Sequence, residues 1–409
     1  MSAFARSIFG PPLPDEHRWN FIHLYFDVFW WGLLNGSTIA FLAVYASRIN
    51  ASAYQVGLLT AAPALVNVLL TLPITGFVKG KSSIQLVRWS NLIMRLFYLL
   101  LIPLPILFNQ EIQVWMIIII TLVMNIPGAI NGVMGNVFLA ETIPPEWRSQ
   151  VIGTRNALLA VSSMLSSFMV GWILSSLSFT SGYMVVFALG FAGSMGSSIA
   201  LFQVRPNAAM ITAAEEQVSH RKKSGLDWHI LAGPYGRLMG LMFLFHFSVF
   251  LAGPIFPLYQ VRDLNFTDEL ISQGTALFWI IHAIAATQTS VITRRLGYKK
   301  MTGWGTVLTA LSTIIFIFSY QPWIYLLCQV VSGMGWAMIG GALLNYLLEK
   351  IPGENRPPYL AWFNMMVNGS MLICGLIAGS VVDLMGRGGG MWFAVGLRLL
   401  SALAILVLG

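Results

Sequence analysis

The sequence predicts an all-α polytopic membrane protein whose twelve transmembrane helices form two six-helix bundles related by pseudo-symmetry. Hydrophobic residues make up 57% of the 409 residues and charged residues only 9%, whereas about 25% of an ordinary soluble domain is charged. Apolar runs of about 20 residues, long enough to cross a bilayer, recur along the whole chain. Alternating segments of about ten residues, which would indicate a β-barrel, are absent.

The apolar segments divide the chain into two halves. We expect a tail at 1–19, an N-terminal bundle at 20–203, a central loop at 204–235 and a C-terminal bundle at 236–409. The twelve spans are predicted at about 20–46, 54–78, 85–107, 112–140, 149–176, 180–203, 236–260, 269–293, 299–319, 322–348, 358–383 and 390–408.

The basic residues predict the orientation of these spans. Eighteen of the 23 Lys and Arg residues fall in the tail, in the central loop or in loops that follow even-numbered spans. Because cytoplasmic loops carry an excess of Lys and Arg, both termini are predicted to be cytoplasmic and the protein to lie in the inner (cytoplasmic) membrane. The net charge of +8 is therefore explained by topology, and no nucleic-acid partner is expected.

The two halves contain a repeated loop. The pattern E-x-I-P-x-E-x-R occurs at Glu141–Arg148 and again 208 residues later at Glu349–Arg356. Two parallel six-span repeats are an arrangement found in transporters. The chain resembles the major facilitator superfamily over essentially its whole length. That resemblance implies a monomeric secondary transporter that works by alternating access, with a small-molecule substrate bound between the halves.

A partial loop signature supports the same resemblance. The family pattern G-x-x-x-D-R/K-x-G-R/K-R/K is matched after the eighth span by Arg295, Gly297 and Lys299, but Arg294 replaces the acid. After the second span, Gly76 and Lys81 match. We expect carboxylates of the repeated loop to replace the missing acid in a cytoplasmic latch. Its predicted members are Lys81, Glu141, Arg148, Arg295, Glu349 and Arg356.

Asp27 is the one acid, among fifteen Asp and Glu residues, that lies well inside a predicted span. A charge at membrane depth costs about 2.5–3.5 kcal/mol on insertion scales, so it needs a partner, a proton or water. We predict that Asp27 is a proton-coupling acid; the alternative is a surface acid neutralised by His23. His246 and His282 are predicted as further proton-coupling residues, and the alternative is a neutral core histidine.

Polar and aromatic residues at mid-depth are candidates for substrate binding. Arg95 is expected either to pair with Asp27 or to hold an anionic substrate, because a buried guanidinium keeps its charge. The predicted substrate-binding residues are Trp31, Asn35, Arg95, Asn131, Trp279 and Trp336. Gly253, Pro254 and Pro257 are expected to break the seventh span near its outer end. Arg398 is expected to contact lipid headgroups or Asp383.

Together these features predict a secondary active transporter. The predicted substrate is a small, moderately hydrophobic organic solute, exported by proton-coupled antiport. Two alternatives stay open: a uniporter or symporter of a small polar metabolite, and a non-transporting receptor or assembly factor on the same scaffold. An enzyme is not expected, since the sequence has no phosphate-binding loop, nucleophile constellation or metal-ligand cluster, and no cofactor is predicted.

Overall fold

The computed structural model describes residues 15–78, 80–205, 228–351 and 356–409, and the regular secondary structure in these ranges is entirely helical. The first half contains α2 (Asp15–Leu34), η1 (Asn35–Ile39), α3 (Ala40–Arg48), α4 (Ala53–Phe77), α5 (Ser83–Leu96), η2 (Phe97–Leu101), α6 (Leu104–Leu107), α7 (Gln110–Thr142), η3 (Pro145–Trp147), α8 (Arg148–Ser176) and α9 (Phe179–Gln203). The second half contains η4 (Trp228–Ala232), α11 (Pro234–Arg262), α12 (Asp268–Ile317), α13 (Pro322–Glu349) and α14 (Arg356–Leu408).

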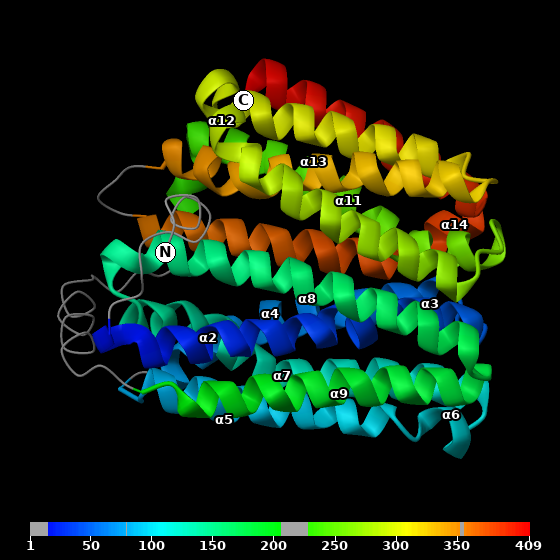
Figure 1. The fold of residues 1–409 in the computed structure, drawn as a ribbon. Helices are drawn as coiled ribbons and strands as arrows, with labels where there is room; N and C mark the ends of the chain where they lie inside the picture. Colours follow the sequence, from blue (N-terminus) through cyan, green and yellow to red (C-terminus); the bar gives the residue numbers. More distant parts are fainter. Residues whose placement is uncertain (1–14, 79, 206–227, 352–355) are drawn as a thin grey trace, which may run out of the picture.

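Ten helices in the described part of the chain are long and apolar enough to cross a membrane, and two of them are of double length. The 50 residues of α12 and the 53 of α14 span about 75–80 Å, more than twice a hydrocarbon core of about 30 Å. Each is interrupted by a glycine with positive φ, Gly297 at 76° and Gly386 at 70°, a conformation that suits glycine because it has no Cβ. In Figure 1 the lime and yellow parts of α12 run side by side in opposite directions. The described helices therefore comprise twelve membrane-length segments, which fits the prediction.

The helices form two layers, one from each half of the chain (Figure 1). Helices α2 to α9 make one layer and α11 to α14 the other, and the start of α2 and the end of α14 lie at the same end of the bundle. We call this the near end, and we call the opposite end, where α3 and α11 finish, the far end. The predicted central loop, 204–235, falls largely outside the described residues.

The hydrophobic core shows where the two layers meet. One cluster joins both halves and includes Phe41 and Tyr45 of α3 together with Ile255 and Leu258 of α11, all at most 1% exposed. Two other clusters each belong to one half: the first is built around Phe21 and the second around Tyr235 and neighbours near the start of α11. The layers thus share a core toward the far end and have separate cores toward the near end.

The seventh span is not broken, which corrects the prediction from Gly253, Pro254 and Pro257. Helix α11 continues through both prolines to Arg262. Ile255, between them, is fully buried in the shared core. Packing on that face holds the helix together, since neighbouring helices make proline tolerable within a membrane span.

Candidate functional site

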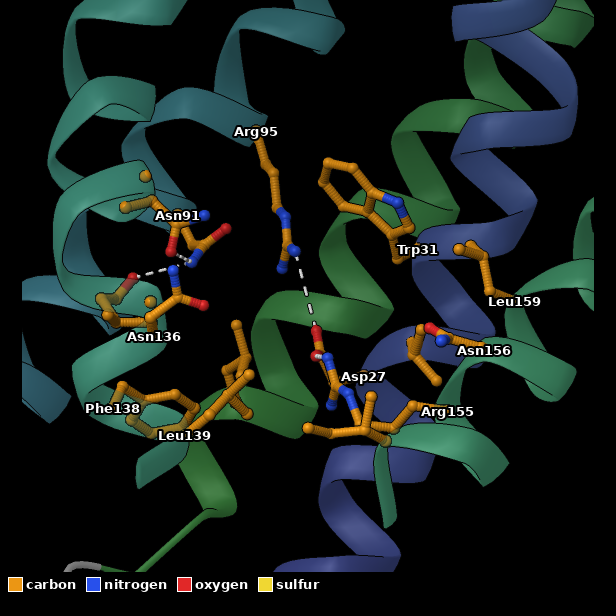
Figure 2. Close-up of a pocket in the computed structure, with 17 residues that line it drawn as sticks. Asp27, Trp31, Asn91, Arg95, Asn136, Phe138, Leu139, Arg155, Asn156 and Leu159 are labelled. Carbon is orange, nitrogen blue, oxygen red and sulfur yellow. Dashed lines mark hydrogen bonds and ion pairs between the residues drawn. The ribbon is translucent and has the colours of Figure 1, made fainter. Parts of the chain in front are cut away.

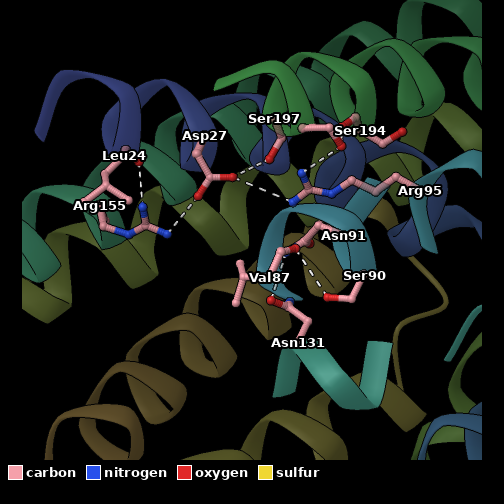
Figure 3. Close-up of polar contacts among 11 residues, drawn as sticks. Leu24, Asp27, Val87, Ser90, Asn91, Arg95, Asn131, Arg155, Ser194 and Ser197 are labelled. Atoms are coloured by element: carbon pink, nitrogen blue, oxygen red, sulfur yellow. Dashed lines mark hydrogen bonds and ion pairs between the residues drawn. The ribbon is translucent and has the colours of Figure 1, made fainter. Parts of the chain in front are cut away.

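The carboxylate of Asp27 lies at the centre of a polar cluster inside the first half (Figure 3). Asp27 projects from α2 and is only 6% exposed. Its Oδ1 accepts a hydrogen bond of 2.5 Å from Ser197 of α9 and lies 3.7 Å from a guanidinium nitrogen of Arg95. Its Oδ2 accepts a hydrogen bond of 3.1 Å from Arg155. His23, the partner proposed in the alternative interpretation, instead contacts the Trp19 carbonyl through Nδ1 at 2.8 Å.

Arg95 reaches this cluster from α5 and is 2% exposed. One guanidinium nitrogen donates to the Ser198 hydroxyl at 3.2 Å, and the group lies 5.5 Å from the ring of Trp31. Its Nε has no hydrogen-bond partner among the described residues. The proximity to Asp27 is the pairing that the sequence offered as one of two roles. The N–H at Nε of Arg95 is therefore available to donate a hydrogen bond to a ligand.

Arg155 lines the candidate site, although the sequence did not single it out as a site residue. It lies inside α8 and points at Asp27. Its guanidinium donates to the Leu24 carbonyl at 2.6 Å and to the Asp27 carboxylate at 3.1 Å. Arg155 lies about two turns into the helix from Arg148, and this depth is the feature of the sequence that could have marked it as a site residue. A long basic side chain there can reach either the membrane surface or the interior.

A cavity of about 540 Å³ opens beside the cluster (Figure 2). Its walls come from five helices of the first half, α2, α5, α7, α8 and α9. The polar lining residues are Asp27, Asn91, Arg95, Asn131, Asn136, Arg155 and Asn156. Asn91 donates to the Asn131 side-chain oxygen at 2.8 Å, whereas its own side-chain oxygen has no partner among the described residues. Trp31 and Phe138 supply apolar surface.

The charge of this cavity is unbalanced. Two guanidinium groups, from Arg95 and Arg155, face one carboxylate, that of Asp27. Arginine stays protonated in proteins and binds carboxylates and phosphates in a planar fork. A cavity with one excess positive charge and several amide groups is suited to a small organic anion.

The second half contributes a smaller, mainly apolar cavity of about 300 Å³. His246 and Trp336 line it together with Phe250 and other apolar side chains of α11 and α13. The His246 ring lies 5.9 Å from that of Phe250, and its Nδ1 contacts the Met242 carbonyl at 2.8 Å. His246 is therefore tied to its own helix and surrounded by aromatic rings.

Three other predicted residues lie away from the cluster around Asp27. His282 and Trp279 are neighbours on α12, with ring centroids 5.8 Å apart. The Asn35 side chain donates to the Ser163 hydroxyl of α8 at 3.1 Å. Asn35 begins the π-helical turn η1, and Gly36 beside it lies so close to α8 that a Cβ there would approach the Ser163 carbonyl oxygen to 2.2 Å.

The predicted latch residues take several different positions. Lys81 places its Nζ 3.3 Å from the centroid of the Phe77 ring. Glu141 accepts a hydrogen bond from the Ser83 hydroxyl, and Arg148 donates to the carbonyls of Ala140 and Ile143. Arg295 and Glu349 are exposed. The side chain of Arg356 lies outside the described residues.

The two halves are linked at the far end. Arg48, the last residue of α3, forms an ion pair of 3.0 Å with Asp268 at the start of α12 and also donates to the Phe266 carbonyl. Arg262 donates to the Ala51 carbonyl at 2.7 Å. The cavity beside Asp27 lies on the near side of these contacts. The far end is thus closed in this conformation, and the near ends of the two halves have separate cores.

Arg398 does not contact lipid headgroups or Asp383, contrary to the prediction. It is 5% exposed within the second half, where it donates to the Thr309 carbonyl and to the Thr313 hydroxyl. Thr309 and Thr313 of α12 thus give the Arg398 guanidinium hydrogen-bond acceptors inside the bundle, which acyl chains could not provide. The sequence alone does not show which side of this helix faces the bundle, and Arg398 lies on the inward side.

Two layers of membrane-length helices, with a charged cavity in the first, define a multi-pass membrane protein. Residues 24–234 and 238–409 match the model of the Major Facilitator Superfamily. The chain belongs to the Major Facilitator Superfamily, and membership of this transporter family, together with the fold, implies a secondary transporter rather than an enzyme. No curated protein matches the sequence.

Solved structures of similar fold are transporters. A variant of the nucleoside transporter NupG is 16% identical, with a TM-score of 0.74, over 94% of this chain and 98% of that chain. A D-xylose-proton symporter is 15% identical, with a TM-score of 0.70, over 95% and 96%. A bacterial homologue of the iron transporter ferroportin, in an inward-facing state, is 11% identical, with a TM-score of 0.68, over 94% and 97%. At these identities the likeness establishes the fold alone.

Proposed function

We propose that this protein transports a small organic anion that carries an apolar or aromatic group. The observation that carries the proposal is the pair of arginines, Arg95 and Arg155, that share the single carboxylate of Asp27 in a cavity of about 540 Å³. The carboxylate of a substrate would replace or join that of Asp27 on the guanidinium groups. The amides of Asn91 and Asn131 would bind further polar atoms of the same molecule.

The apolar part of the substrate is assigned to the second half. Trp336, Phe250 and His246 form an aromatic wall. Trp336 and His246 lie at a depth similar to that of Asp27, about 18–20 Å from the near end of their helices, and Phe250 lies one turn deeper. When the near ends of the halves approach each other, this wall would cover a substrate held by Arg95 and Arg155. The proposal keeps the moderately hydrophobic solute expected from sequence and adds a negative charge to it.

Proton coupling follows from competition for the two arginines. When Asp27 takes up a proton it loses its charge, and Arg95 and Arg155 become available to an anion. Proton and anion then bind together, and a ligand shifts a conformational equilibrium only through its different affinity for the two states. This linkage favours symport, which the sequence left as an alternative, over the antiport that it favoured. With the near end taken as cytoplasmic from its basic loops, the direction would be uptake.

Transport into proteoliposomes tests this function. A panel of radiolabelled aromatic and aliphatic carboxylates is compared with the matching uncharged amides, with the lumen either alkaline or acidic relative to the bath. We expect accumulation of a carboxylate, and not of its amide, in the alkaline lumen. Accumulation in the acidic lumen would indicate antiport, and preference for the amide would refute the anionic substrate.

Variants locate the activity in the cavity. Arg95→Gln and Arg155→Gln are each expected to lower carboxylate uptake at least tenfold, because each removes a charged hydrogen-bond donor. Asp27→Asn is expected to retain exchange of labelled for unlabelled substrate but to lose the response to the pH gradient. Arg237→Gln, an exposed residue of α11, is the matched control and should leave uptake unchanged.

A further inference from the structure

A groove of about 430 Å³ runs along the outer face of the first half, away from the cavity beside Asp27. It begins at the near end, between the end of α4 and the start of α5, and continues toward α7. Its lining includes Phe77, Lys81, Ser82, Gln85, Trp89 and Ile93. From Gln85 to Ile93 the groove follows two turns of α5, about 12 Å at 1.5 Å per residue.

The inner part of the groove is apolar and exposed. Trp89 is 57% exposed and Ile93 is 48% exposed. The Trp89 ring is held edge-on against Phe202 of α9, with centroids 5.5 Å apart, so this wall has a defined shape. On a helix that crosses a bilayer, exposed apolar side chains at this depth face acyl chains. A surface hollowed between such side chains fits one acyl chain better than a flat surface does.

The mouth of the groove is positive. Lys81 is exposed, and no carboxylate lies within ion-pair distance of it among the described residues. Helix α5 begins here with Ser82 as its N-cap, but the Ser82 side chain makes no capping hydrogen bond and the first turn has no acidic residue. The first N–H groups of a helix lack internal partners and attract anions, phosphate above all. Lys81 and the start of α5 thus converge on one place.

One carboxylate lies next to this mouth. Glu141 accepts a hydrogen bond from the hydroxyl of Ser83, the first residue of α5, and contributes one negative charge there. Arg88, one turn beyond Gln85, adds a second cation on this helix, and its guanidinium donates to the carbonyls of Leu201 and Val204 rather than to an acid. Lys81 and Arg88 are two cations against the one carboxylate of Glu141, so the three groups at the near end of α5 carry a net charge of +1.

We propose that this groove binds one anionic phospholipid. Its headgroup phosphate lies at Lys81 and the uncapped start of α5, and one acyl chain follows Trp89 and Ile93 toward α7. A lipid accounts for both parts of the groove, since a free phosphate ion would use the mouth and leave the apolar wall empty. The site is independent of the transported substrate, because it opens on the opposite side of α5 from Asn91 and Arg95.

Lipid titration of the purified full-length protein in micelles tests the proposal. Binding is measured by native mass spectrometry and by the thermal unfolding midpoint with phosphatidylglycerol, with phosphatidylcholine of the same acyl chains, and with glycerol 3-phosphate. We expect phosphatidylglycerol to bind and raise the midpoint, with little effect of the other two. Equal effects of the two lipids would overturn the proposal in favour of a general lipid layer, and an equal effect of glycerol 3-phosphate would replace the lipid by a free phosphate.

Two variants address the two parts of the groove. Lys81→Gln is expected to weaken phosphatidylglycerol binding about fivefold, the usual effect of one cation at an anionic lipid surface. Ile93→Trp adds bulk to the apolar wall of the groove. We expect it to weaken phosphatidylglycerol binding at least fivefold, although it leaves the charge of the groove unchanged. Lys300→Gln, an exposed residue of the second half, is the control. Equal binding by Lys81→Gln and the control would overturn the assignment.

Discussion

Replacing Asp27 and Arg155, singly and together, tests the charge cluster in the first half. The Asp27 side chain is 8% exposed and that of Arg155 is 17% exposed. Removing one partner of a fully buried ion pair costs about 3–5 kcal/mol, because the other charge is left without compensation. Asp27→Asn leaves two guanidinium groups facing each other, and we expect a loss of about 3 kcal/mol in the free energy of unfolding.

Arg155→Gln should cost less than Asp27→Asn. The carboxylate of Asp27 then keeps Ser197 at 2.5 Å and Arg95 at 3.7 Å. Because Arg155 is partly exposed, we expect a loss of about 1–2 kcal/mol, between the values for exposed and buried pairs. The double variant contains neither member of the pair, so its loss should be smaller than the sum of the single losses by at least about 1 kcal/mol.

Unfolding of the purified variants in mixed micelles, titrated with a denaturing detergent and followed by circular dichroism, measures these differences. Arg237→Gln, in the other half and exposed, should stay within about 0.5 kcal/mol of the unmodified protein. Single losses that add to within about 0.5 kcal/mol would show that Asp27 and Arg155 are energetically independent. That result would also remove the physical basis for competition between Asp27 and a substrate anion.

Three further variants test the arrangement of the halves and the second buried arginine. Arg48→Gln removes the ion pair with Asp268. We expect the free-energy difference between the closed and open far ends to shift toward the open form by about 1 kcal/mol. Spin labels placed on the two halves would then show a second distance. Gly57→Ala places a Cβ 2.1 Å from the Gly375 carbonyl oxygen. We expect it to shift the equilibrium toward the open far end by about 1–3 kcal/mol, measured by the same label distances. Unchanged distances in either variant would contradict the contacts. Arg398→Met removes a buried cation whose partners are neutral, so the free energy of unfolding from the detergent titration should change by less than about 1 kcal/mol. A loss above about 3 kcal/mol would show that Arg398 has a negatively charged partner.

The sequence by itself determined the helices and the family. A membrane span needs about 20 consecutive apolar residues, so one continuous segment of the sequence is enough to predict it. The turns within α12 and α14 follow from local chemistry too, because Gly297 and Gly386 adopt positive φ. Asp27 stood out for the same reason: a charge within an apolar run is conspicuous without any knowledge of its neighbours.

The tertiary structure alone decided what surrounds that charge. Arg155 and Ser197 reach Asp27 from α8 and α9, 128 and 170 residues away in the chain. Whether a side chain near a helix end points to the bilayer surface or into the bundle depends on how that helix is rotated against its neighbours. Arg155 and Arg398 both point inward. Hydrophobicity along the chain places the ends of a helix but leaves this rotation open, and contacts between helices determine it.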